Sequence, residues 1–236
     1  MLAVNLACEI ATDLHSAQPQ TLLIDLDCAY GAASILCGLA PKHCVGDVLH
    51  TDHAIDAELL SKSVIPCSGG LHVLASPASL RPPRSMPLDY SRLGELVVTA
   101  SRCYRTVVID APRLPHDVFA TLACDSDAIL LVLQLNVKDL RMATATLDAL
   151  QEQSIPRDRV IAVANRVTKP TAISVEDAAR VIGVREILRV RDDAVSASEC
   201  VNSGRPLVRS AEASTLRSDI RAILPHIEAH VAAAPS

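Results

Sequence analysis

The chain has 236 residues and a mass of 25.1 kDa, enough to bury a substantial apolar core, and this length favours one α/β domain over two. Half of the residues are hydrophobic but only 2% are aromatic, so we expect a core of Ala, Val, Leu and Ile. The formal charge of −5 disfavours nucleic acid as a general partner, and the scarcity of aromatic rings leaves few surfaces on which bases could stack.

Other residue patterns argue against a membrane-spanning protein, a disulfide-bonded protein and a zinc site. No apolar stretch approaches the roughly 20 residues that a membrane-spanning helix needs, so no transmembrane segment is expected. None of the eight cysteines forms a CxxC pair, which favours reduced thiols in a cytoplasmic protein. His50 and His53 have no matching second pair of metal ligands, so we read them as loop residues and not as a zinc site.

Hydrophobic spacing predicts strands and helices in alternation along the chain, which is typical of a parallel sheet. This order predicts a three-layer αβα sandwich over residues 1–236, with ligands bound outside the carboxyl ends of the strands. The expected strands are 21–27, 71–77, 105–110, 128–133, 159–165 and 186–190, the expected helices are 1–16, 54–64, 89–103, 115–124, 137–153, 174–182, 193–202 and 214–230, and a surface loop is expected at 79–87.

Three acids follow apolar strand residues. Asp25 and Asp27 end the string TLLIDLD, and Asp110 ends TVVID. A carboxylate at the end of a buried strand costs desolvation energy unless it meets a cation, water or a backbone donor. Each acid could instead cap the helix that follows its strand. Three of them on converging strands favour a role in the ligand site.

The strings around Asp110 and Asn165 suggest more specific chemistry. YRTVVIDAPR has the general form of a Walker B strand, whose acid holds a magnesium ion through a water molecule. Asn165 and Arg166 lie at the end of the expected strand VIAVAN, where the amide could read the edge of a base. A turn-forming asparagine is the simpler alternative.

Read in order, the strings TLLIDLDCAYGAASILCGLAPKH, CSGGLHVLASP, YRTVVIDAPR, VANRV and SGRPLV closely resemble the pilus-assembly ATPases of the CpaE/TadZ type. These belong to the MinD/ParA group of deviant Walker, or P-loop, ATPases. The resemblance implies ATP and Mg²⁺ as cofactors and a homodimer when ATP is bound. It implies that Asp27 positions the attacking water and that Asp110 is the catalytic Walker B acid linked to the metal. Asp25, Asn165 and Arg166 would be nucleotide-binding residues, the last two lying against adenine.

The chain departs from this family pattern at its start. The helix MLAVNLACEIA is similar to the helix that follows the family's phosphate loop, KGGxGK followed by Ser or Thr, and Met1 stands about where the last residue of that loop would be. The first strand, the Walker A loop and both lysines are absent from the printed residues, so we expect two unpaired strand edges. In addition, Ala32 replaces a common acid and Ala111 replaces a common Leu.

Two explanations remain open, an N-terminally truncated gene model and a degenerate homologue; the retained acids favour the first. By resemblance, the intact protein would localise and assemble a Flp/Tad-type pilus or a type II/IV-like secretion apparatus, with partners at the inner membrane or cell pole, while this chain alone would not bind or hydrolyse ATP. The alternatives are a non-enzymatic docking scaffold and a ParA-type DNA-partitioning ATPase.

Overall fold

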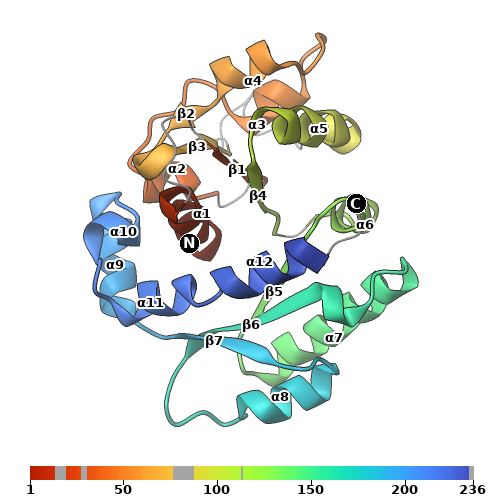
Figure 1. The fold of residues 1–236 in the computed structure, drawn as a ribbon, viewed down its shortest axis with the longest axis vertical. Coiled ribbons are helices and arrows are strands. Elements are labelled where there is room, and N and C mark those ends of the chain that lie inside the picture. The colour runs from red at the N-terminus through yellow and green to blue at the C-terminus, as the bar shows by residue number, and fades with distance from the viewer. Residues whose placement is uncertain (14–19, 28–30, 77–87, 113, 234–236) are drawn as a thin grey trace. The chain divides into compact units, whose positions relative to one another are not determined.

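The structure is a computed structural model that describes residues 1–13, 20–27, 31–76, 88–112 and 114–233. It is an α/β structure whose strands are mostly parallel, as the sequence predicts (Figure 1). The chain divides into two compact units, unit 1 (Met1–Leu114 and Ser196–Glu212) and unit 2 (Pro115–Val195 and Ala213–Ser236). The assignment of the whole chain to one domain stays a prediction. The loop expected at 79–87 lies outside the described residues.

Unit 1 contains a four-stranded sheet in the order β2-β3-β1-β4. The strands β3, β1 and β4 run parallel, whereas the two-residue β2 is antiparallel to β3 and was not predicted. All five residues of β1 are buried, while those of β4, at the edge of the sheet, are half-buried. The strands of unit 1 are β1 (Thr21–Asp25), β2 (Ile65–Pro66), β3 (Leu71–Leu74) and β4 (Thr106–Asp110).

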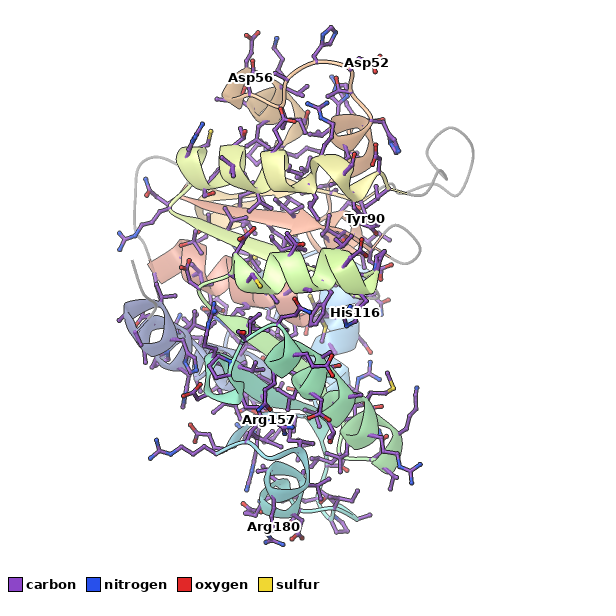
Figure 2. The ribbon with its side chains drawn as sticks, turned by 90° about the vertical axis from the view of Figure 1, so that its right-hand side faces the viewer. Asp52, Asp56, Tyr90, His116, Arg157 and Arg180 are labelled. Carbon is purple, nitrogen blue, oxygen red and sulfur yellow. The ribbon has the colours of Figure 1, made fainter. Side chains whose placement is uncertain are left out.

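Helices cover this sheet. Helix α1 packs against β1 and β4, and α5 packs against β4 from the opposite face (Figure 1). Asp56, labelled in Figure 2, begins α4 by accepting a hydrogen bond from the backbone N–H of Leu59 at 2.8 Å. The helices of unit 1 are α1 (Leu2–Asp13), α2 (Ala33–Leu36), α3 (Val45–Leu49), α4 (Ala57–Ser63), α5 (Leu93–Cys103), most of α9 (Ala194–Ser203) and α10 (Leu207–Ser210), with 3-10 turns η1 (Ser68–Gly70) and η2 (Tyr90–Arg92).

Unit 2 contains a three-stranded parallel sheet in the order β5-β6-β7. Helices α7 and α8 lie together on one face, and α11 contacts β7 on the other (Figure 1). Arg157, labelled in Figure 2, hydrogen-bonds the Ile182 carbonyl and pairs with Asp148, which ties α8 to α7. The elements are α6 (His116–Cys124), β5 (Ile129–Leu133), α7 (Val137–Glu152), η3 (Arg157–Arg159), β6 (Val160–Val167), α8 (Val175–Ile182), β7 (Ile187–Arg191), α11 (Thr215–Arg221) and α12 (Leu224–Ala233).

Local sequence explains where the helices of unit 2 begin and end. The side chains of Asn136 and Ser174 accept hydrogen bonds from the first turns of α7 and α8. Gly183 ends α8 with a φ of 70°, a conformation that costs glycine little. Residues of this kind at these positions made both helices predictable from the sequence.

The core is aliphatic, as the composition predicts, since the largest fully buried side chains are all Leu or Ile. The expected helix 214–230 is wrong, because it breaks into α11 and α12. Pro225 supplies the reason: its ring excludes the carbonyl of the residue four positions earlier, Arg221, and α11 ends there. No helix within the described ranges is long and apolar enough to cross a membrane.

The boundaries of three strands also differ from expectation. Strand β3 ends at Leu74, short of the expected end at 77. Strand β1 ends at Asp25, so Asp27 lies two residues beyond it, and β6 continues past Asn165 to Val167. The described strands form two sheets, in which β4 and β5 are edge strands. The expectation that a missing first strand leaves two unpaired edges stays a prediction.

Candidate functional site

The carboxyl ends of three neighbouring strands in unit 1 bring polar side chains together. Asp25 ends β1, Asp110 ends β4, and Ser76 follows β3 by two residues. Asp25 and Asp110 are register partners, so their side chains emerge on the same face of the sheet. The two strands remain joined beyond this pair, because the N–H of Leu26 donates to the Asp110 carbonyl at 2.9 Å.

Asp25 is only 1% exposed, and its carboxylate accepts hydrogen bonds from three of the described residues. One oxygen accepts from the N–H of Asp27 at 3.0 Å, and the other accepts from the N–H of Ala33 at 3.2 Å and the hydroxyl of Ser76 at 3.0 Å. Ala33 is the first residue of α2. The capping alternative therefore describes much of what Asp25 does, because its carboxylate binds the N–H of Asp27 just beyond β1 and the N–H of Ala33 at the start of α2.

Asp110 lies in a different environment. It is half-buried, and within the described residues no hydrogen bond to its carboxylate is present. Burial raises the pKa of Asp110, the amino group of Met1 opposes this rise, and the nearby carboxylates of Asp25 and Asp27 add to it. Burial also raises the pKa of Asp25, although its three hydrogen-bond donors oppose the change. The nearby carboxylates thus give the Asp110 carboxylate an electrostatic reason to take a cation.

Asp27 lies two residues beyond the end of β1. Its side chain is half-buried, and its backbone N–H is the donor to Asp25. The structure therefore places Asp27 near the same strand ends as the other two acids, although outside the regular strand.

Gly31 allows the close approach that completes this corner. A Cβ at Gly31 would lie 1.6 Å from the Ser76 hydroxyl oxygen and 2.5 Å from the Asp27 carbonyl oxygen. Only glycine fits this position without displacing the backbone. Neither Gly31 nor Ser76 was singled out as a site residue from the sequence; the run LASP, in which Ser76 follows a strand opposite two acids, was the available signal.

Asn165 and Arg166 belong to unit 2, whereas the three acids belong to unit 1. Both lie in an irregular part of β6, where the register with β7 shifts between Ala164 and Val167. Arg166 adopts a φ of 55°, and its N–H donates to the Asn165 side-chain oxygen at 3.0 Å. Strained backbone of this kind is concentrated at functional sites in proteins. The Arg166 side chain is exposed and is not part of the core beneath the sheet.

The acidic side chains at these strand ends suit a magnesium ion that also binds water and phosphate better than a metal ion bound by protein side chains alone. Among the described residues, no group of three His, Cys, Asp or Glu side chains could hold a metal ion. Mg²⁺ prefers oxygen ligands, retains several waters, and is commonly bound through one or two carboxylates together with substrate phosphates. Asp110, with Asp25 and Asp27 nearby, offers such carboxylates. None of the chain's lysines adjoins a glycine, so the printed residues contain no Walker A motif.

Solved structures resemble this arrangement over nearly the whole chain. A ParA family ATPase from Chlorobium tepidum matches with a TM-score of 0.83 and 21% identity, covering 95% of this chain and 92% of that one. MinD with Mg-ADP from Pyrococcus horikoshii matches with a TM-score of 0.76 and 16% identity over 96% and 90% of the two chains. The MinC:MinD cell division complex of Aquifex aeolicus matches with a TM-score of 0.73 and 19% identity over 96% and 89%.

The chain has the ParA/MinD ATPase fold. No protein-family model matches its sequence, and no curated protein matches it. The ParA/MinD fold accounts for the mostly parallel strands. Asp25 and Asp110 lie at the carboxyl ends of such strands, where open α/β sheets bind ligands. At these identities the comparison establishes the fold, and the role of each site residue follows as a proposal.

Proposed function

We propose that the chain works in a MinD-like ATPase that helps to localise and assemble a Flp/Tad-type pilus or a type II/IV-like secretion apparatus. The observation that carries the ATPase part is the side-by-side placement of Asp25 and Asp110 at the ends of adjacent parallel strands, in a chain with the ParA/MinD fold. The pilus part rests on the sequence strings that resemble CpaE/TadZ proteins.

Each acid has its own task in this proposal. Asp110 holds a magnesium ion through a water molecule, and Asp27 positions the water that attacks the terminal phosphate. Asp25 supports Asp27 by accepting a hydrogen bond from its backbone N–H, and it also binds the first residue of α2. Asn165 and Arg166 bind the adenine. Magnesium supplies neutralisation of the negative charge that develops on the phosphates.

The printed residues alone are not expected to bind or hydrolyse ATP. Backbone hydrogen bonds to a charged phosphate contribute about 1.5–3 kcal/mol each. A Walker A loop supplies roughly four of them, so its absence weakens binding by about 6–12 kcal/mol. Since each 1.4 kcal/mol corresponds to about a tenfold change in affinity, a micromolar site would become undetectable.

The test compares two versions of the protein: residues 1–236, and a version extended by any in-frame residues encoded upstream. Magnesium-dependent ATP binding and hydrolysis are measured for both. We expect activity only in the extended version and a dimer when ATP is bound. In that version Asp27→Ala should abolish hydrolysis but retain ATP binding, while Asp110→Asn should weaken magnesium-dependent binding. Robust turnover by residues 1–236 would contradict the proposal.

The cellular part has a separate test. Deleting the gene in its host should remove surface pili or secretion, and the hydrolysis-deficient Asp27→Ala version should not restore them. We expect the protein at the inner membrane or cell pole. Normal assembly in the deletion strain, together with salt-dependent DNA binding, would favour a ParA-type partitioning ATPase. An upstream sequence without a glycine-lysine loop would favour a docking scaffold.

A further inference from the structure

A buried serine from the end of β3 contacts one of the acids of unit 1. Ser76 lies two residues beyond β3 and is only 1% exposed. Its hydroxyl donates a hydrogen bond of 3.0 Å to the carboxylate of Asp25. The residue before it, Ala75, is held by α3, because its carbonyl accepts a 2.9 Å hydrogen bond from the N–H of Val45. Ser76 therefore approaches Asp25 from a backbone that is itself anchored.

The surroundings of the Ser76 hydroxyl direct it to this one acceptor. A Cβ at Gly31 would lie 1.6 Å from the hydroxyl oxygen, so the backbone of Gly31 packs directly against it. A buried hydroxyl costs free energy unless it is hydrogen-bonded, and the Asp25 carboxylate meets that need. Hydrogen bonds to a carboxylate are stronger than those between neutral groups. The contact between Ser76 and Asp25 is thus both confined and strong.

This contact bears on how the Asp25 carboxylate is oriented. One oxygen accepts from Ser76 at 3.0 Å and from the N–H of Ala33 at 3.2 Å, and the other accepts from the N–H of Asp27 at 3.0 Å. The torsion that turns a carboxylate plane has a broad energy minimum, so hydrogen bonds decide its angle. Without the Ser76 hydroxyl, the first oxygen would keep the Ala33 contact, which is the longest of the three. The plane could then turn away from the Asp27 N–H.

Asp110 is not part of this arrangement. Within the described residues, no hydrogen bond joins its carboxylate to Ser76 or to Asp25. Loss of the Ser76 hydroxyl should therefore disturb Asp27 more than Asp110.

We propose that Ser76 is a positioning residue for ATP hydrolysis: it orients the Asp25 carboxylate, which fixes the backbone of Asp27 and with it the side chain that positions the attacking water. The task of Asp27 rests on the proposed function. The contacts from Ser76 through Asp25 to the Asp27 N–H do not, since they are present in residues 1–236. Ser76 acts through Asp25 and touches neither the water nor the phosphates.

The first measurement is amide hydrogen exchange, followed by NMR in the 236-residue protein. Ser76→Ala should speed exchange at the N–H groups of Asp27 and Ala33 by about tenfold or more, because their shared acceptor is held less firmly. The N–H of Leu23, buried inside β1, reports opening of the sheet and should change less. Equal acceleration at all three amides, or none at Asp27, would overturn the proposal.

Ser63→Ala is the matched control. Ser63 is another buried serine of unit 1, and its hydroxyl donates to the Leu59 carbonyl at 2.8 Å within α4. This variant loses the same chemical group at a site that does not contact Asp25. We expect it to leave exchange at Asp27 and Ala33 unchanged.

The second measurement separates turnover from binding in the extended version of the protein. Ser76→Ala should lower kcat by about tenfold or more while the Kd for Mg-ATP changes by less than about twofold, because a misplaced Asp27 affects the reacting water and not the bound nucleotide. Ser63→Ala should keep both values. A general loss of structure in Ser76→Ala would weaken binding and turnover together.

The outcomes distinguish this proposal from the proposed function. An active extended protein whose kcat is unaltered by Ser76→Ala would overturn the role of Ser76 and leave the ATPase function standing. An extended protein that does not hydrolyse ATP would refute the ATPase function, and with it the catalytic task of Ser76. The exchange rates in residues 1–236 would still decide whether Ser76 holds Asp27 through Asp25.

Discussion

Asp25 and Asp110 are register partners at the ends of the adjacent parallel strands β1 and β4, yet their carboxylates are held very differently. Asp25 accepts hydrogen bonds from Asp27, Ala33 and Ser76, whereas Asp110 accepts none within the described residues. The pair therefore combines one acid that stabilises local structure with one that remains available to a ligand. Substitution by asparagine should separate these roles.

Asp110→Asn should stabilise the protein by about 0.5–1 kcal/mol at neutral pH, a common gain when a functional residue is removed. Its folded pKa is raised above the ordinary value of 3.8, so the unfolded chain carries the charge more readily. The stability that Asp110 contributes is fully present below pH 3.8, the ordinary pKa, and is lost as pH rises through the folded pKa. Urea unfolding should show the gain at pH 7 and its disappearance near pH 3.5; a loss at pH 7 would contradict this.

Asp25→Asn should destabilise the protein, although the pKa of Asp25 is raised as well. An asparagine has one acceptor oxygen and presents an NH₂ group where a carboxylate oxygen accepted a hydrogen bond. The N–H of Asp27 or of Ala33 then loses its partner, at a cost of about 1–3 kcal/mol, which exceeds the gain from removing the charge. Comparing the unfolding free energies of the two asparagine variants under one condition checks the difference in sign.

Gly31→Ala should destabilise unit 1 by roughly 2 kcal/mol or more, because the new methyl group overlaps Ser76 and the Asp27 backbone. Adding Ser76→Ala should not restore stability, since a Cβ at Gly31 would still lie 2.5 Å from the Ser76 Cβ and from the Asp27 carbonyl oxygen. Gly94→Ala is the matched control. Its Cβ would meet nothing within 4 Å inside α5, and we expect a gain of up to about 1 kcal/mol. Equal effects of the two alanines on thermal unfolding would refute the close contact at Gly31.

The order of strands and helices could be predicted because apolar periodicity is a local property of the sequence. Helix starts such as Ser174 and the end at Gly183 were equally local. The break between α11 and α12 was also encoded locally, by Pro225, but the apolar face running through both helices concealed it.

The contacts that distinguish the acids could not be predicted, because they join distant residues. Ser76 reaches Asp25 across 51 positions, and no spacing rule connects them. The sequence identified which strands end in acids, and the fold decides which of those acids has its oxygens already occupied.

His72 should make the protein less stable as pH falls from about 7 to about 5. Burial lowers the pKa of His72 below its ordinary 6.5, and its ring hydrogen-bonds the Tyr104 hydroxyl at 2.7 Å. Because the folded pKa is depressed, the unfolded chain takes up protons first, so stability is present above 6.5 and is lost as pH falls. His72→Gln should flatten the curve of unfolding free energy against pH. The exposed His53→Gln should keep the slope of the unmodified protein, and an unchanged slope in His72→Gln would count against this role.

Arg166→Gly should stabilise unit 2 slightly, by roughly 0.5–1 kcal/mol, because a left-handed backbone costs a residue with a Cβ about 1–2 kcal/mol. The hydrogen bond from the backbone N–H of residue 166 to Asn165 survives this change. Arg180→Gly, at an exposed helical position labelled in Figure 2, is the control and should cost about 1 kcal/mol. Opposite signs of the two changes in unfolding free energy, measured by chemical denaturation, would establish that the chain maintains strain at Arg166.

In the extended, ATP-binding version the proposed adenine contact adds a second readout. Arg166→Gly should weaken ATP binding while the protein becomes more stable, whereas Arg180→Gly should leave ATP affinity unchanged. Unaltered affinity in Arg166→Gly would remove this residue from the nucleotide site.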